Sequence, residues 1–152
     1  MTETRDEGDI GADYIETLLD IADMDGDIDI DESERRTTLI VGEPGDESLA
    51  PLSDPDTVAA LQELTRLSVQ AKTGEFSRVV LDVAGSRDAR ARELEEMVDR
   101  AVASIEGGSD AVPLEPMSSY ERKIVHDIVS ARGYRSESEG EGRDRHTVVK
   151  AP

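Results

Sequence analysis

Residues 118–131, Ser-Ser-Tyr-Glu-Arg-Lys-Ile-Val-His-Asp-Ile-Val-Ser-Ala, decide the fold of the C-terminal half of this chain. Apolar side chains recur at helical spacing, so the stretch predicts an amphipathic helix that buries Tyr120, Ile124, Val125 and Ile128. Its solvent side is then left with Arg122, Lys123, His126 and Ser130. One helix therefore combines a core face with a polar face that carries two cations and an imidazole.

The segments around this helix predict a small α+β module. A long helix before it is indicated by Leu94, Met97, Val98, Ala101, Val102 and Ile105, and the pair Gly107-Gly108 ends that helix. Val112 to Leu114 predicts a short strand. Tyr134 to Ser138 and His146 to Lys150 flank the Gly-rich residues 140–142, which predicts a closing β-hairpin.

The N-terminal half predicts a second α+β module with the order α-β-β-α-α-β. Residues 1–11 are acidic and poor in apolar side chains, which predicts a disordered tail. The elements expected after it are a helix over Ala12–Met24, strands over Asp27–Asp31 (Ile28 and Ile30 inward) and Arg36–Val41 joined by a turn at Glu32–Arg35, a loop or short helical piece over Gly42–Leu52, a helix capped by Asp54 with Pro55 at its first position, and a strand over Phe76–Val83. The predicted domains are residues 12–84 and 85–152.

The charge of the chain is unevenly divided between these halves. The 152 residues carry a net charge of −19, with a pI near 4.3, which by itself argues against a phosphate-binding surface. Residues 1–56 hold 19 acids and 3 bases, or −16, whereas residues 57–152 hold 17 acids and 14 bases, or −3. The second part therefore keeps enough cations to meet a polyanion.

The alternating acids near residue 27 also fit a calcium-loop pattern in part. Counting from Asp23, carboxylates at Asp25, Asp27, Asp29 and Asp31 fall at odd positions and Glu34 falls at the twelfth. The sixth position, where the sharp turn requires glycine, is Ile28. Strand alternation explains the same spacing, so we expect no metal site here.

Arg122 and His126 are the most informative polar pair. Residues four apart lie on one face of a helix, one turn from each other. A guanidinium can bind a phosphate through two hydrogen bonds, and an imidazole can donate to a phosphate or a base. The spacing alone also fits an ordinary solvated helix face with a surface histidine.

The wider context of this pair resembles a known family. Leu114 to His126, followed by Ser136 to Gly142, resembles the bacterial Jag (SpoIIIJ-associated, KhpB) proteins, as does Leu61 to Leu67 running into Arg78 to Gly85. The resemblance covers roughly residues 12–150. It implies a type II KH domain followed by a single-stranded nucleic-acid-binding domain that is named for its Arg-x-x-x-His motif.

The resemblance carries expectations for individual residues and roles. It implies that Arg122 and His126 meet RNA or single-stranded DNA, in a cytoplasmic protein with roles in cell shape, cell-wall organisation and as a chaperone. It also implies a small single-KH protein as a partner. Charge alone suggests that the binding surface extends over further bases, namely Lys123, Arg132, Arg135, Arg143, Arg145 and Lys150.

The KH half departs from the family pattern at its phosphate-binding loop. A KH domain clamps the nucleic-acid backbone with a Gly-x-x-Gly loop before its second central helix. Here that loop becomes Leu52-Ser53-Asp54-Pro55, or Ser53 to Asp56 in the other register, and neither register contains glycine. Pro55 lacks an amide hydrogen, and Asp54 brings negative charge. We therefore expect a degenerate KH-like half that does not bind nucleic acid in the usual way.

Other functional classes find little support in the sequence. There is no cysteine, no Gly-x-Ser-x-Gly, no phosphate loop, and no metal-ligand spacing between His126 and His146. We expect no catalysis, no cofactor, no secretory signal and no membrane span. The remaining rival is a protein-interaction adaptor that uses its acidic half and needs little or no nucleic acid.

Overall fold

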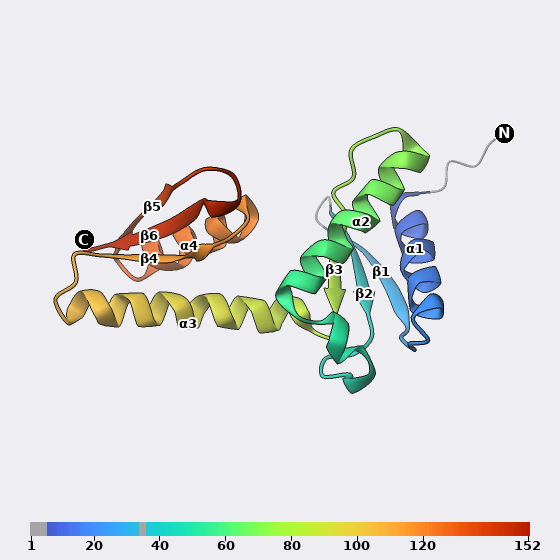
Figure 1. The fold of residues 1–152 in the computed structure, drawn as a ribbon, viewed down its shortest axis with the longest axis horizontal. Helices are drawn as coiled ribbons and strands as arrows, with labels where there is room; N and C mark the ends of the chain where they lie inside the picture. The colour runs from blue at the N-terminus through green and yellow to red at the C-terminus, as the bar shows by residue number, and fades with distance from the viewer. Residues whose placement is uncertain (1–5, 34–35) are drawn as a thin grey trace. The chain divides into compact units, whose positions relative to one another are not determined.

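In the computed structural model, residues 6–33 and 36–152 are described, and they divide into two compact units, residues up to Ala89 and from Arg90. Each unit joins helices to one small three-stranded sheet (Figure 1). The predicted α+β class is thus confirmed. None of the helices in the described ranges has the length and hydropathy that a membrane crossing requires.

The N-terminal unit follows the expected element order. Its elements are α1 (Glu7–Ile21), β1 (Ile28–Ser33), β2 (Arg36–Val41), the 3-10 helix η1 (Glu47–Leu52), α2 (Pro55–Thr73) and β3 (Val80–Val83). β2 lies in the centre of the sheet, antiparallel to β1 and parallel to β3. The strand order places Leu39 beside Leu81 and Val41 beside Val83, and these four buried side chains form the core with residues of α1 and α2.

The first helix begins earlier than the sequence predicts. Asp6 caps it, accepting hydrogen bonds from the amides of Gly8 and Asp9, so residues 7–11 are helical rather than part of a tail. The glycines that suggest a linker have a packing role instead. A Cβ at Gly8 would lie 2.8 Å from Ile30, and one at Gly11 would lie 2.9 Å from Leu39. The helix can approach the sheet closely because these positions lack side chains.

Two strand predictions need correction. Ile30 does not point inward as predicted, since its side chain is 38% exposed on the edge strand β1, and Ile28 is half-buried. The strand predicted from Phe76 begins only at Val80, and Phe76 itself is 76% exposed. The turn predicted at Glu32–Arg35 is covered by β1 up to Ser33, and its last two residues lie outside the described residues.

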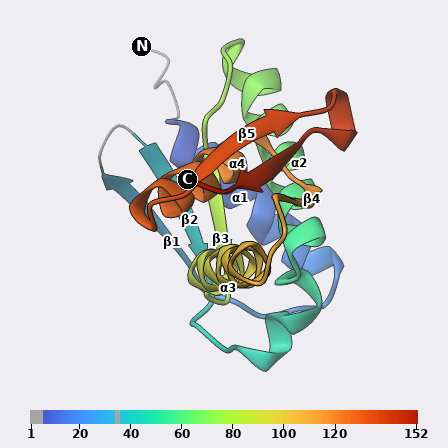
Figure 2. The ribbon, with the colours of Figure 1, turned by 90° about the vertical axis from the view of Figure 1, so that its left-hand side faces the viewer.

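The C-terminal unit is built around the helix quoted at the outset. It contains most of α3 (Ser86–Glu106), followed by β4 (Ala111–Pro116), α4 (Ser119–Ala131), β5 (Arg135–Glu139), the 3-10 helix η2 (Gly142–Asp144) and β6 (His146–Lys150). β6 lies between β4 and β5 in an antiparallel sheet, and Figure 2 shows α3 nearly end-on. The core joins α3, α4 and β6 through Leu94, Val98, Ala101, Val125, Val129 and Val149. The buried stripe of α4 therefore centres on Val125 and Val129, whereas Tyr120 is 47% exposed.

Candidate nucleic-acid interface

The helix α4 is held so that Arg122 and His126 lie along the side that meets β5. Ser118 caps the helix, and its hydroxyl accepts a hydrogen bond from the amide of Glu121 at 3.2 Å. Val125 and Val129 are fully buried against the sheet. Arg122 and His126 flank that buried stripe, so both side chains are half-buried rather than fully solvated as the sequence suggests.

One hydroxyl connects the two side chains. Arg122 donates from Nη1 to the hydroxyl of Ser138 at 3.0 Å and from Nε to the carbonyl of Met117 at 3.3 Å. The Nε2 atom of His126 lies 3.0 Å from the same Ser138 hydroxyl, and its Nδ1 lies 2.5 Å from the hydroxyl of Ser136. The structure therefore brings Arg122 and His126 together through strand β5.

The electrostatics of this cluster favour an uncharged imidazole. Partial burial lowers the pKa of His126 below its ordinary value of 6.5, and the positive charge of Arg122 lowers it further, against a weaker opposing effect of Asp127. Among the described residues, Arg122 makes no ion pair with a carboxylate. A guanidinium in this state can accept an anion from solvent.

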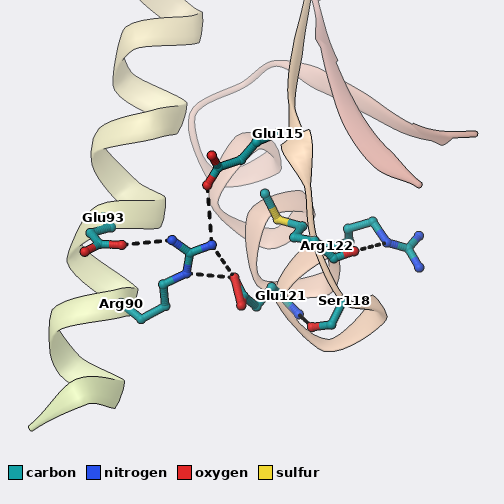
Figure 3. A network of polar contacts seen from close by, with 7 residues as sticks. Arg90, Glu93, Glu115, Ser118, Glu121 and Arg122 are labelled. Carbon is teal, nitrogen blue, oxygen red and sulfur yellow. Dashed lines mark hydrogen bonds and ion pairs between the residues drawn. The ribbon is translucent and has the colours of Figure 1, made fainter. Parts of the chain in front are cut away.

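The nearest carboxylates are engaged elsewhere. Glu121 precedes Arg122 on the chain, but it pairs with Arg90 of α3 at 2.9 Å, and Arg90 also reaches Glu93 at 2.8 Å and Glu115 at 3.6 Å. Figure 3 shows that the guanidinium of Arg122 points away from this network. Those three carboxylates therefore do not neutralise Arg122.

The remaining acids near the site are also paired with other bases. Asp127 pairs with Lys123 at 3.4 Å on the exposed side of α4. Glu137 pairs with Lys150 at 2.7 Å, and Glu139 lies 3.8 Å from the same lysine. Glu137 and Glu139 alternate with the serines of β5, so they stand on the opposite face of the sheet from Ser136 and Ser138.

The other bases predicted from charge alone do not form one surface with Arg122. Arg132 caps the far end of α4 and pairs with Asp99, and Arg135 donates to the carbonyl of Ala151 at 3.0 Å. Arg132 follows Arg122 by roughly ten residues at the helical rise, which is about 15 Å along the axis. Both arginines therefore belong to the opposite end of the unit.

Arg143 and Arg145 lie at the same end as Arg122. They are exposed in the turn between β5 and β6, where Arg145 donates to the carbonyl of Gly140 at 2.9 Å. The amide of Met117 donates to the carbonyl of Arg145 at 3.3 Å, and the carbonyl of Met117 accepts from Arg122. One backbone residue thus links this turn to the Arg122 guanidinium.

Sequence reasoning misses the two serines that organise the site. The predicted closing hairpin includes Ser136 and Ser138, but it gives them no role. The signal is present, because hydroxyls at alternate positions of a strand share one face. What the sequence alone does not supply is the register that sets this strand against α4.

The calcium alternative has no counterpart among the residues that the structure describes. Within these ranges, no group of three or more acidic or histidine side chains is placed to hold a metal ion. Glu34, the last ligand of that pattern, lies outside the described residues. The alternation at residues 27–31 forms strand β1 instead.

The start of α2 replaces the expected phosphate loop. Asp54 caps this helix, and its carboxylate accepts hydrogen bonds from the amide of Thr57 at 3.0 Å and from the Thr57 hydroxyl. The Thr57 hydroxyl, with a smaller contribution from its amide, lowers the pKa of Asp54 below its ordinary value of 3.8. A fixed negative charge therefore occupies the helix end where a KH loop would receive a phosphate.

Comparison with known proteins confirms the resemblance. Residues 92–151 match the family of domains named for the Arg-x-x-x-His motif, so the C-terminal part of the chain is an Arg-x-x-x-His domain. Over 90% of its length, the chain is 27% identical to a protein of Bacillus subtilis (strain 168) and 28% identical to proteins of Clostridium symbiosum and Lactiplantibacillus plantarum, each named RNA-binding protein KhpB. The chain spans 66%, 62% and 42% of the length of these relatives, respectively.

Proposed function

We propose that this protein binds RNA, or single-stranded nucleic acid more broadly, through the Arg-x-x-x-His domain. Arg122 holds a backbone phosphate and His126 contacts the chain beside it, while Arg143 and Arg145 extend the surface from the neighbouring turn. The names of the three homologues support RNA as the ligand. The proposed setting is the cytoplasm, and the roles in cell shape, cell-wall organisation and as a chaperone that the resemblance implies belong to the same proposal.

The observation that carries this proposal is the charge state of Arg122. In a chain of net charge −19, this guanidinium has no carboxylate partner among the described residues, and the acids around it are tied to Arg90, Lys123 and Lys150. Guanidinium–phosphate contacts are short, charge-assisted and geometrically specific. An uncompensated arginine beside a histidine is suited to bind one phosphate of a flexible strand.

The N-terminal unit has a different role in this proposal. We assign residues 12–84 to a degenerate KH-like domain and residues 85–152 to the Arg-x-x-x-His domain. The carboxylate of Asp54 at the start of α2 repels a phosphate where a functional KH loop would attract one. Nucleic acid is therefore held by the C-terminal domain.

The test is a fluorescence-anisotropy titration of a labelled single-stranded RNA at several salt concentrations. Arg122→Ala combined with His126→Ala should weaken binding by about tenfold or more and reduce the slope of log affinity against log salt by about one. Arg132→Ala is the matched control, because Arg132 lies at the end of the same helix and already pairs with Asp99. Unchanged affinity and slope in the double variant would refute the proposal.

A second candidate function is a protein-interaction adaptor. It is favoured by the carboxylate cap at the start of α2 and by two exposed leucines on that helix, Leu64 and Leu67, which are 47% and 51% exposed. A small single-KH protein is the partner class that the family resemblance implies. Complexes that survive ribonuclease treatment, together with an absence of RNA crosslinked to the chain, would favour this function over the first.

A further inference from the structure

The strand β5 divides its side chains into two chemically distinct sets. Arg135, Glu137 and Glu139 are exposed, whereas Ser136 and Ser138 are half-buried. Ser136 is opposite Val149 and Ser138 is opposite Thr147 on β6, and both of these β6 residues are buried. Since cross-strand neighbours share a face, the two serines point to the side of the sheet on which α4 packs.

The two serines together contact three nitrogen atoms of the proposed phosphate-binding pair. Ser138 lies 3.0 Å from Nη1 of Arg122 and 3.0 Å from Nε2 of His126, and Ser136 lies 2.5 Å from Nδ1 of His126. The Met117 carbonyl holds Nε of Arg122. Both ring nitrogens of the histidine and two nitrogens of the arginine are thus fixed by short polar groups.

Hydrogen-bond accounting determines which groups donate. Arginine is always protonated and has only donors, so the Ser138 hydroxyl accepts from Arg122. Its own hydrogen can then be donated to Nε2 of a neutral His126, which leaves the ring hydrogen on Nδ1 to be donated to Ser136. The lowered pKa of His126 agrees with this neutral ring.

The same hydroxyls also suit the charged ring. When a phosphate approaches, its negative charge favours protonation of His126, and both ring nitrogens then donate. Ser136 and Ser138 can each accept such a bond, since a hydroxyl has two lone pairs. An alanine at either position could neither donate nor accept, so the ring would lose that anchor.

We propose that Ser138, assisted by Ser136, is a positioning residue of the Arg-x-x-x-His site, whose hydroxyl holds Arg122 and His126 in one arrangement in both protonation states of the ring. This inference rests on the proposed function, because the pair that it aligns is the proposed phosphate ligand. A preset arrangement strengthens binding, since less freedom is lost when the phosphate arrives.

The experiment compares Ser138→Ala with Ser138→Thr, which keeps a hydroxyl and suits a strand. We expect Ser138→Ala to weaken binding of the labelled single-stranded RNA by about threefold to tenfold at an unchanged melting temperature, and Ser138→Thr to restore most of the affinity. Ser130→Ala is the matched control, since it removes an exposed hydroxyl one helical turn beyond His126. It should leave the affinity unchanged.

A second readout separates positioning from a general loss of stability. Nitrogen-15 spectra of the His126 ring should show the hydrogen on Nδ1 in the natural protein, and Ser138→Ala should change that distribution. Full affinity in Ser138→Ala, or an unchanged ring spectrum, would overturn the inference. If Arg122→Ala with His126→Ala weakens binding and Ser138→Ala does not, only the positioning role fails. If the double variant binds RNA normally, the proposed function fails, and the ring spectrum still tests the hold of Ser138 on His126.

Discussion

The starts of helices α2 and α4 solve the same backbone problem in opposite ways. Both helices leave amides without partners in their first turn, and both use a side-chain oxygen to accept from one of them. At α2 that oxygen belongs to the carboxylate of Asp54, and at α4 it belongs to the neutral hydroxyl of Ser118. The first helix start repels an anion, whereas the second leaves Arg122 uncompensated one turn further on. The comparison teaches that one uncompensated cation locates a phosphate site better than the net charge of the chain does.

The largest expected effect separates the stability of the two units from RNA binding. Leu39→Ala removes a fully buried side chain from the N-terminal core and should lower the free energy of unfolding of that unit by about 2–5 kcal/mol. RNA affinity measured where the protein is still folded should change by less than about twofold. Urea unfolding and anisotropy test the two parts of this prediction.

The matched variant for that experiment is Leu94→Ala in the C-terminal core. It removes the same side chain from the cluster that supports α4, so it should weaken both stability and RNA binding. Equal losses of RNA affinity in Leu39→Ala and Leu94→Ala would contradict the division of roles between the units.

The next effect concerns the two ends of the C-terminal unit. Arg143→Ala with Arg145→Ala removes two exposed cations next to Met117 and Arg122, and should weaken RNA binding by about threefold to tenfold. Arg132→Ala with Arg135→Ala removes the same charge from the opposite end, where Arg132 is already paired, and should change affinity by less than about twofold. Anisotropy at fixed salt measures both, and the reverse order would place the nucleic acid at the wrong end.

A smaller effect is the pH dependence of His126. Because its folded pKa lies below 6.5, the stability that the neutral ring contributes is present above pH 6.5 and is lost as the pH falls through the folded pKa. Proton NMR should give a midpoint below 6.5. Arg122→Gln should raise that midpoint only in part, since burial is the larger cause. A midpoint at or above 6.5 in the natural protein would show that the ring is not held as described.

The smallest effect is the ionisation of Asp54. Its lowered pKa means that the cap stabilises α2 above pH 3.8 and loses its effect as the pH falls through the folded pKa. Thr57→Val removes the hydroxyl that is the main cause, so the carboxyl midpoint measured by NMR should rise toward 3.8. An unchanged midpoint in this variant would show that Thr57 does not hold the carboxylate.

Much of this fold is predictable from local sequence signals. The Asp54–Pro55 start of α2, the strand Arg36–Val41 and the closing hairpin all lie where the pattern predicts. The prediction fails where a long-range contact decides the outcome. Gly8 resembles part of a linker, and its value becomes visible only when Ile30 of β1 is found against it.

The candidate site shows the same limit. Helical spacing alone puts Arg122 and His126 on one side of α4, because both residues belong to one element. The partners that fix them, Ser136 and Ser138, come from another element, and their placement depends on how β5 is set against α4. The sorting of Arg143 and Arg145 from Arg132 likewise requires the path of the chain through the hairpin.

The most direct test of the central claim follows backbone amide signals by NMR while a short single-stranded RNA is added to the full chain. The account predicts that the largest shifts occur at Arg122, His126, Ser138 and Arg145, with little change from Ser53 to Thr57 at the start of α2. Shifts concentrated at the start of α2, with α4 and β5 unaffected, would contradict it.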